Sequence, residues 1–252
     1  MSGRFDLSGK RAFVTGANTG IGQGIALALA EAGATVACAG RSSMDETLAA
    51  ISAAGGTARE WLGDLADKDV AVGLFEAAAA EHGAFDILVN NAGIIRRADA
   101  VDFTEADWDD VLDLNLKTAF FLSQAFGKAA IADGRRGSIV NIASVLTFQG
   151  GIRVASYTAS KHGIAGVTKL LACEWAGKDI NVNAIAPGYI VTNNTAALRD
   201  DPDRTAAILS RIPAGRWGEA SDIGGAAVFL ASDAARYIHG AVLPVDGGWL
   251  AR

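Results

Sequence analysis

The sequence predicts an α/β domain built on a doubly wound parallel sheet with helices on both faces. Short apolar or β-branched runs alternate with longer helical patterns along the 252 residues, which is typical of βα units. Predicted strands such as Ile87–Asn90 are apolar at nearly every position, as expected for strands covered on both faces. No Pro/Gly/Ser-rich linker or change in composition divides the chain, so residues 1–252 are expected to form one domain.

Seven strands are expected at Arg11–Thr15, Thr35–Ala39, Thr57–Leu62, Ile87–Asn90, Ser138–Ile142, Asn181–Ile185 and Ala241–Val245. Six helices are expected between them, at Ile21–Ala32, Asp45–Ala54, Lys68–Glu81, Trp108–Ala132, Tyr157–Ala176 and Ser221–Ala231. The stretch 187–217 is a long excursion with one helix near Arg204–Ser210. Because long insertions in compact domains usually bind ligands, we expect this stretch to be a substrate loop.

Composition excludes several classes of protein. The net charge is -6 with no block of like charge, so we expect neither nucleic acid nor membrane as a partner. Cys38 and Cys173 lie in apolar patterns and are expected to be buried free thiols. The three histidines are isolated in sequence, so no metal site is expected. The start of the chain lacks a signal-peptide pattern and no run is long enough to span a membrane, which favours a cytoplasmic protein.

The turn after the first strand carries a glycine pattern, Gly-x-x-x-Gly-x-Gly, directly before an amphipathic helix. Glycines let the backbone approach a pyrophosphate, whose charge is favoured at a helix N-terminus. The spacing differs from the commoner G-x-G-x-x-G, so the pattern alone leaves a plain tight turn open. Its position at the carboxyl end of a strand favours a dinucleotide. The expected cofactor contacts here are Gly16, Asn18, Thr19, Gly20, Ile21 and Gly22.

Further cofactor contacts are expected at the ends of the next strands. Asp64 and Leu65 end the third strand and Asn91, Ala92 and Gly93 follow the fourth. Asp64 either accepts a hydrogen bond from an adenine amine or caps a helix. The second strand ends in Gly40 rather than in an acidic residue that would bind ribose hydroxyls. Arg41 and Ser42 would hold a 2′-phosphate, so the sequence leans towards NADP(H), with NAD(H) as the alternative.

Three side chains suggest proton transfer. Tyr157 and Lys161 are four residues apart in a helical run and therefore share a face. A neighbouring ammonium favours phenolate, so this pair would supply an acid/base near neutral pH. Ser144 follows a predicted strand and would hold a substrate carbonyl oxygen beside the phenol. Asn115 is a poor helix former within a leucine-rich helix, and indicates either a neighbour-bonded amide or a kink that holds a relay water.

Taken together, these motifs resemble the short-chain dehydrogenase/reductase family, across the whole chain and in the same order. The resemblance implies a Rossmann-like sheet ordered 3-2-1-4-5-6-7, an NAD(P)-dependent oxidoreductase acting on CH-OH groups, and a homotetramer. It implies that Ser144 orients the substrate oxygen, Tyr157 is the general acid/base, Lys161 binds the nicotinamide ribose, and Asn115 holds a relay water. It also implies that Pro187, Gly188, Ile190 and Thr192 belong to the loop that holds the carboxamide.

The stretches 93–97, 148–153, 186–195, 212–218 and 245–252 resemble the family branch named 2-dehydro-3-deoxy-D-gluconate 5-dehydrogenase or 2-deoxy-D-gluconate 3-dehydrogenase. The resemblance implies a keto/hydroxy interconversion on an anionic deoxy sugar acid. Arg96 and Arg153 would bind the carboxylate and Gln149 the hydroxyls, although surface ion pairs are an equal possibility for the arginines. For Arg97 and Arg216, ion pairs are favoured. Trp249 is expected to be a packing residue.

Two other functions compete with this one. In the first, the chain is a reductase of another carbonyl substrate, such as a 3-oxoacyl thioester or an alginate-derived keto uronate. In the second, it is a non-catalytic nucleotide sensor. The arginines argue against a long acyl substrate, which would prefer an apolar cleft. A sensor has no need of Ser144, Tyr157 and Lys161 together.

Overall fold

The computed structural model describes residues 3–252, so Met1 and Ser2 of the predicted domain lie outside the described residues. One parallel sheet has the strand order β3-β2-β1-β4-β5-β6-β7, which confirms the predicted doubly wound architecture. Every strand lies within two residues of its predicted bounds. The strands are β1 Arg11–Thr15, β2 Thr35–Gly40, β3 Thr57–Leu62, β4 Ile87–Asn90, β5 Gly137–Ile142, β6 Ile180–Pro187 and β7 Val242–Val245.

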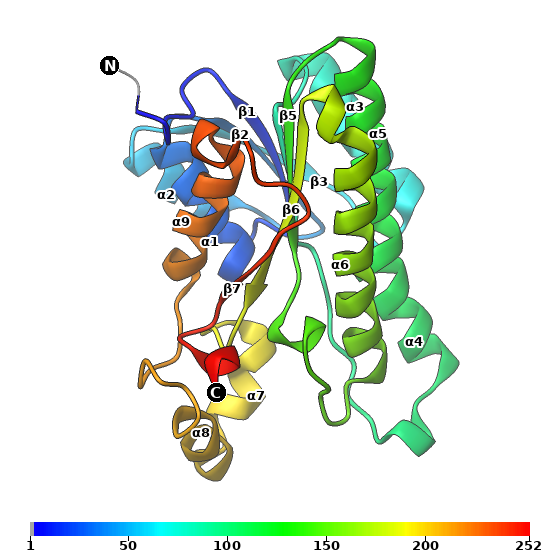
Figure 1. Cartoon of the computed structure of the whole chain (residues 1–252), viewed down its shortest axis with the longest axis vertical. Coiled ribbons are helices and arrows are strands. Elements are labelled where there is room, and N and C mark those ends of the chain that lie inside the picture. Colours follow the sequence, from blue (N-terminus) through cyan, green and yellow to red (C-terminus); the bar gives the residue numbers. More distant parts are fainter. Residues whose placement is uncertain (1–2) are drawn as a thin grey trace.

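Helices cover both faces of the sheet (Figure 1). One face carries α1 (Gly20–Glu31), α2 (Asp45–Ala53) and α9 (Ala220–Ala231), with a core that includes Ile25, Leu29, Ile223 and Leu230. The other face carries α3 (Lys68–His82), α5 (Ala119–Ala132) and α6 (Ala155–Trp175), with a core that includes Phe13, Phe75, Phe126 and Trp175. Both faces of the sheet are therefore covered by apolar cores, although β5 and β6 also carry the buried polar residues Asn141 and Asn183.

The helix predicted at Trp108–Ala132 is not continuous. It begins earlier, as α4 (Glu105–Leu112), because the Thr104 hydroxyl accepts a hydrogen bond from the amide of Asp107 and caps its first turn. A π-helical turn at Asp113–Thr118 then separates α4 from α5. Such turns interrupt the regular helix and occur frequently at functional sites. Asn115 lies within this turn, so the predicted irregularity at that residue is real.

The excursion after β6 contains two helices rather than the single one predicted. They are α7 (Ala196–Arg199) and α8 (Pro202–Leu209). The Asp201 carboxylate accepts from the amides of Asp203 and Arg204, and Pro202 occupies the first turn, which together fix the start of α8. Short 3-10 turns complete the described chain, at Ala100–Asp102, Val145–Thr147, Ala176–Lys178, Asn193–Thr195, Asp233–Ala235 and Trp249–Ala251.

The two cysteines are both free, but only one is buried. Cys38 lies inside β2, where burial raises the pKa of its thiol to about 12. Cys173 is exposed, so its predicted burial was wrong. The helical pattern of α6 explains this, because Leu171, Ala172 and Trp175 take the inward positions of that turn.

Within residues 3–252, no helix is long and apolar enough to cross a membrane. The same described residues contain no group of three or more His, Cys, Asp or Glu side chains placed to hold a metal ion.

Candidate active site

The glycine-rich turn between β1 and α1 is tightly packed. Gly16 and Gly20 have positive φ angles of 65° and 57°, which side-chain-bearing residues rarely adopt. A Cβ on Gly22 would lie 2.1 Å from the Gly16 carbonyl oxygen, so only glycine fits there. The Asn91 side-chain amide donates to the carbonyls of Thr15 and Gly16 at 2.9 and 3.1 Å. These contacts hold the turn against the end of β4.

The N-terminus of α1 is left open for a ligand. Thr19 makes no capping hydrogen bond from its side chain, and the first turn of α1 contains no acidic residue. By contrast, Asp67 caps α3 and Asp201 caps α8. An uncapped helix start presents free N–H groups and the positive end of the helix dipole. The residues present therefore fit a dinucleotide pyrophosphate.

A cleft of about 200 Å³ begins at this turn and extends to the predicted catalytic residues. Twelve of the residues predicted to contact the cofactor line this cleft, and their contact with a cofactor stays a prediction. The lining residues are Gly16, Asn18, Thr19, Gly20, Ile21, Gly22, Asn91, Ala92, Gly93, Ile142, Tyr157, Lys161, Thr192, Asn193 and Asn194. Ile142, Asn193 and Asn194 were not predicted, because their contribution depends on where β5 ends and how the loop after β6 folds back.

Other predicted contacts lie outside this lining. Arg41 and Ser42 are exposed beyond the buried end of β2 at Gly40. The exposed Asp64 carboxylate accepts a hydrogen bond from the Ala66 amide in a local turn, and the cap of α3 is Asp67 instead. Pro187 is the last residue of β6 and Gly188 follows it. The carbonyl oxygen of the buried Leu65 accepts a hydrogen bond from the Thr118 hydroxyl.

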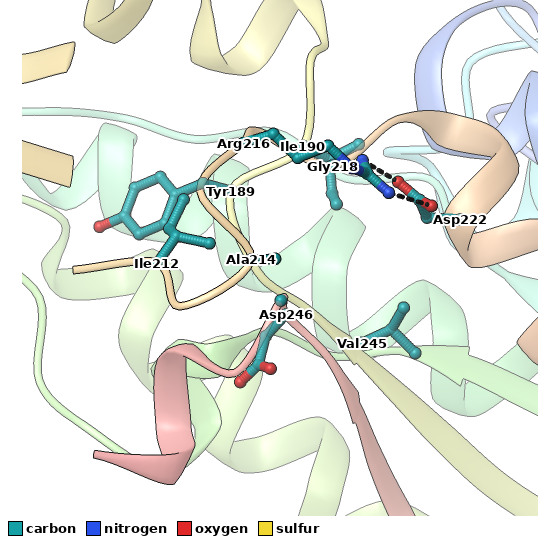
Figure 2. A pocket seen from close by; sticks show the side chains of 10 residues that line it. Tyr189, Ile190, Ile212, Ala214, Arg216, Gly218, Asp222, Val245 and Asp246 are labelled. Carbon is teal, nitrogen blue, oxygen red and sulfur yellow. Dashed lines mark hydrogen bonds and ion pairs between the residues drawn. The ribbon is translucent and has the colours of Figure 1, made fainter. Parts of the chain in front are cut away.

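Ile190 lines a second cavity, shown in Figure 2, between the substrate loop and the segment that follows β7. Arg216 forms a bidentate ion pair with Asp222 at its edge, with distances of 2.7 and 2.8 Å. The pair, together with the Glu219 amide, lowers the pKa of Asp222 to about 2. Both side chains are substantially exposed, so solvent screening limits the energy of this contact. The expected ion pair at Arg216 is therefore confirmed.

The Ser144, Tyr157 and Lys161 side chains come together where β5 and α6 meet the cleft. Lys161 is 5% exposed, and its ammonium donates to the Ile142 carbonyl at 2.6 Å. Its Nζ lies 5.4 Å from the centroid of the Tyr157 ring. The Ser144 hydroxyl accepts from the Leu146 amide and lies close enough to the phenol to lower its pKa. The structure therefore brings the three side chains together, and their action on one substrate oxygen stays a prediction.

The pKa shifts of this group differ in cause from the sequence-based expectation. Burial raises the pKa of Tyr157 above its ordinary value, while Ser144 and then Arg97 lower it. Lys161 is not among the groups that shift it. Burial lowers the pKa of Lys161 itself to about 8. The groups that lower the pKa of Tyr157 are therefore a hydroxyl and an arginine rather than Lys161.

Asn115 joins the catalytic helix to the segment after β4. Its Oδ1 accepts from the Ile94 amide at 2.9 Å, and its Nδ2 donates to the Ile94 carbonyl and to the Ser160 hydroxyl at 3.0 and 3.3 Å. Of the two interpretations from the sequence, the neighbour-bonded amide is present, and it lies inside a π-helical turn. A relay water at Asn115 stays a prediction.

Arg96 and Arg153, the two predicted carboxylate ligands, are engaged in ion pairs. Arg96 lies 3.4 Å from Asp107 and 2.9 Å from Asp110, and Arg153 lies 3.2 Å from Asp99. Their charges are partly compensated before any substrate arrives. The surface ion pairs that the sequence analysis gave as an equal possibility for these two arginines are therefore present in the structure.

Arg97, for which the sequence favoured an ion pair, forms none with the residues that the structure describes. One guanidinium nitrogen donates to the Asn194 carbonyl at 3.0 Å, across the mouth of the cleft. Its charge acts on the Tyr157 phenol, and among the described residues no carboxylate pairs with it. Gln149 is half-buried and has no side-chain hydrogen bond within residues 3–252. Its predicted contact with substrate hydroxyls stays a prediction.

Comparison with known proteins decides the family. The family model described as enoyl-(acyl carrier protein) reductase matches residues 16–250. The chain is a member of the short-chain dehydrogenase/reductase family. It is 56% identical to 2-dehydro-3-deoxy-D-gluconate 5-dehydrogenase of Escherichia coli K12 over 248 residues, which cover 98% of each chain. The Bacillus subtilis 168 protein of the same name is 54% identical over 98% of this chain and 97% of its own length.

Solved structures of short-chain dehydrogenases superpose closely on this chain. An Agrobacterium tumefaciens protein with bound NADP, provisionally named 2-deoxy-D-gluconate 3-dehydrogenase, has a TM-score of 0.95 and 65% identity over 99% of each chain. A gluconate 5-dehydrogenase from Burkholderia cenocepacia J2315, in complex with NADP and tartrate, has a TM-score of 0.93 and 38% identity. That comparison covers 100% of this chain and 99% of the other. The neighbours therefore share the fold over nearly the whole of this chain.

Two supporting residues escaped the sequence analysis. The Thr15 hydroxyl accepts from the amides of Asn91 and Ala92 at 2.9 and 3.0 Å, and so ties β1 to the segment after β4. The Thr147 hydroxyl donates to the Lys161 carbonyl at 2.9 Å and fixes the catalytic helix beside Ser144. A lone threonine carries no sequence signal for such a role, since its partners lie far away along the chain.

Proposed function

We propose that the chain catalyses the reversible NAD(P)(H)-dependent interconversion of a hydroxyl and a keto group on a deoxy sugar acid. The activity is of the 2-dehydro-3-deoxy-D-gluconate 5-dehydrogenase or 2-deoxy-D-gluconate 3-dehydrogenase type. The observation that carries the proposal is that Tyr157 and Lys161, with Ser144 beside the phenol, lie at a cleft that begins at an uncapped, glycine-rich helix start. The names of the similar proteins support the substrate class.

The chemistry follows from these positions. A bound nicotinamide would supply or accept the hydride. Tyr157 exchanges a proton with the reacting oxygen, and the Ser144 hydroxyl donates to that oxygen as charge develops on it. Lys161 would bind the nicotinamide ribose, and its ammonium is oriented by the Ile142 carbonyl. Asn115 keeps the catalytic helix in register with the cleft through Ile94.

NADP(H) is the proposed cofactor. Arg41 and Ser42 are exposed and follow a strand that ends in Gly40, where a carboxylate would repel a 2′-phosphate. An arginine beside a hydroxyl suits that phosphate through charge-assisted hydrogen bonds. The similar structures that hold NADP support the same choice. We also propose a cytoplasmic homotetramer, for which the family resemblance is the support; sedimentation of the purified protein tests its size.

Arg97 is the proposed carboxylate ligand of the substrate. Its guanidinium has an uncharged partner, the Asn194 carbonyl, at the mouth of the cleft and acts electrostatically on Tyr157. A substrate carboxylate would form stronger, charge-assisted bonds with this group. Arg96 and Arg153 already have carboxylate partners, so their capacity for a further anion is smaller.

A turnover screen tests both parts of the proposal. The purified protein is assayed with a panel of C6 sugar acids, matched neutral sugars and a 3-oxoacyl thioester, using NADPH or NADP in parallel with NADH or NAD. We expect turnover of deoxy sugar acids and a preference for the phosphorylated cofactor. A protein that reduces only the thioester, or turns over nothing while binding the cofactor, would contradict the proposed function.

Variants of neighbouring arginines sharpen the result. Arg97→Ala should raise KM for sugar acids about tenfold or more, since a charge-assisted contact is lost. Arg96→Ala, its matched control, should change KM less because Asp107 and Asp110 already engage Arg96. Equal effects on KM for charged and neutral substrates would rule out carboxylate binding by Arg97.

A further inference from the structure

A small hydrophobic core lies under the substrate loop (187–217), separate from the two cores that flank the sheet. Its buried residues are Val145, Ile208, Ile212 and Trp249, and Tyr189, Leu198, Trp217 and Leu250 pack against them. Trp249 belongs to the 246–252 segment that follows β7, and Val145 directly follows Ser144. This satellite core therefore connects three parts of the chain: the substrate loop, the 246–252 segment and the residue next to the catalytic hydroxyl.

A glycine turn lays the 246–252 segment against the loop. Gly247 and Gly248 have φ angles of 64° and 88°, which favour glycine. A Cβ on Gly247 would lie 2.9 Å from Ile212, and one on Gly248 would lie 3.0 Å from Pro213. The Ala214 amide donates to the Gly247 carbonyl at 3.0 Å. Larger residues at 247 and 248 would thus push the segment away from the loop.

The side chain of Asp246 closes the glycine turn that contains Gly247 and Gly248. The Asp246 carboxylate accepts from the amides of Gly248 and Leu250 at 2.8 and 2.9 Å. Figure 2 shows Asp246 on the segment after β7, with Ala214 on the neighbouring loop. The carboxylate satisfies two main-chain donors, so it stabilises the conformation that delivers Trp249 to the satellite core.

Trp249 is held by ring packing. Its side chain is 3% exposed, its ring centroid lies 4.7 Å from that of Tyr189, and the Arg211 guanidinium lies 3.9 Å from the ring centroid. Within residues 3–252, its indole nitrogen has no hydrogen-bond partner. The shape of the ring, together with the cation above it, is therefore what fixes the position of the loop.

The base of the loop is attached independently of Trp249. The Gly218 amide donates to the Tyr189 carbonyl at 2.9 Å, and the Val191 amide donates to the Gly218 carbonyl at 2.8 Å. The Arg216–Asp222 pair joins this base to the first turn of α9. The outer part, α7 and α8, lies beyond these contacts and beside the end of the chain (Figure 1). Packing on the satellite core holds it near Ser144, together with hydrogen bonds from Arg252 to the Ser210 carbonyl and from Arg199 to the Thr192 carbonyl.

We infer that the 246–252 segment is a positioning element of the substrate site, in which Trp249 sets the distance of α7 and α8 from Ser144. Trp249 contacts none of the reacting groups and acts through Ile212 and Val145. A polyhydroxylated acid must be oriented by several groups at once, so a small displacement of α7 and α8 weakens its binding. The inference rests on the proposed function for the identity of the substrate and on the satellite core for the mechanism.

Kinetics of four variants test the inference. Trp249→Ala should raise KM for the sugar acid about tenfold, with cofactor affinity and kcat changed much less. Trp249→Phe, which removes no hydrogen bond, should restore most of this loss. Arg211→Ala, at an exposed position, should raise KM by a smaller factor. Trp175→Ala removes an equally buried indole from the core behind α6, and should lower thermal stability without changing KM.

Hydrogen exchange of the unliganded protein supplies a second readout that needs no substrate. In Trp249→Ala, amides of residues 196–212 should exchange faster while those of residues 16–31 stay unchanged. If Trp249→Ala fails to fold, Arg211→Ala provides the same comparison. Unchanged exchange in the loop of Trp249→Ala would overturn the inference, as would an unchanged KM in a Trp249→Ala protein of lowered stability. A wild-type protein that turns over no sugar acid would refute the proposed function instead, and the exchange result would still decide the role of Trp249.

Discussion

The cofactor cleft is held by hydrogen bonds between side chains and main chain at the ends of central strands, whereas the outer part of the substrate loop rests mainly on the packing of side chains. At the cleft, Asn91 and Thr15 link β1 to the segment after β4, and glycines remove every side chain that would separate them. At the loop, Trp249 and its neighbours form a satellite core with few directional contacts. On the proposed function, the chemistry would depend on the first arrangement and the substrate specificity on the second.

The sharpest test of this division concerns Tyr157. Tyr157→Phe removes the proton-exchanging hydroxyl and keeps the ring, so turnover should fall by about three orders of magnitude. Cofactor affinity should stay within about twofold, because the glycine-rich turn is untouched. Turnover and cofactor binding by fluorescence titration measure the two effects. A variant with wild-type activity would remove Tyr157 from the mechanism.

The rigidity of the cleft is tested by a single added methyl group. In Gly22→Ala, the Cβ would lie 2.1 Å from the Gly16 carbonyl oxygen, so the turn must open. We expect cofactor affinity to fall by about tenfold or more, since the backbone then loses its approach to the pyrophosphate.

Gly73→Ala is the matched control for Gly22→Ala. A Cβ on Gly73, inside α3, would meet no atom within 4 Å. This variant should gain about 0.5–1 kcal/mol of stability from the higher helix propensity of alanine and bind the cofactor normally. Equal cofactor affinities for the two variants would contradict the proposed binding of the pyrophosphate at the glycine-rich turn.

The third prediction concerns the folding stability that is lost because the Lys161 ammonium is buried beside the cleft. Burial lowers the pKa of Lys161 to about 8, so the unfolded chain binds this proton more tightly than the folded one. The cost is therefore fully present below pH 8 and disappears as the pH rises towards 10.5. At pH 7, Lys161→Met should raise the unfolding midpoint, by roughly 5 °C for a gain of about 2 kcal/mol, while it abolishes turnover.

Thermal unfolding at pH 7 and at pH 10 measures this effect. The difference between wild type and Lys161→Met should shrink at the higher pH, where the wild-type ammonium no longer has to be buried. A variant that is less stable than wild type at pH 7 would show that the Ile142 hydrogen bond outweighs the cost of burying the charge.

The sheet and the catalytic group were predictable because each depends on local pattern. Apolar runs located every strand within two residues, and the i, i+4 spacing placed Tyr157 and Lys161 on one face. The only sign of the π-helical turn at Asp113–Thr118 in the sequence was Asn115, a poor helix former within a helical pattern, since helix propensities do not predict π-helical turns. The early start of α4 was missed although Thr104 carries an N-cap signal.

The roles of the arginines were not predictable. Arg96 and Arg97 are adjacent in sequence, and one is paired with carboxylates while the other spans the mouth of the cleft. The partners Asp107, Asp110 and Asn194 are brought there by α4 and the loop after β6. Such long-range contacts decide which positive charge is free for a ligand, and composition or spacing does not contain them.

The satellite core has an evolutionary consequence. One of its buried residues, Val145, lies in the turn after β5, and the rest of it comes from the loop and the 246–252 segment. Substitutions among Ile208, Ile212 and Trp249 would remodel this part of the substrate site without changing the two cores that flank the sheet. A duplicated gene could therefore drift towards a new metabolite in small steps, each of which leaves the redox machinery working.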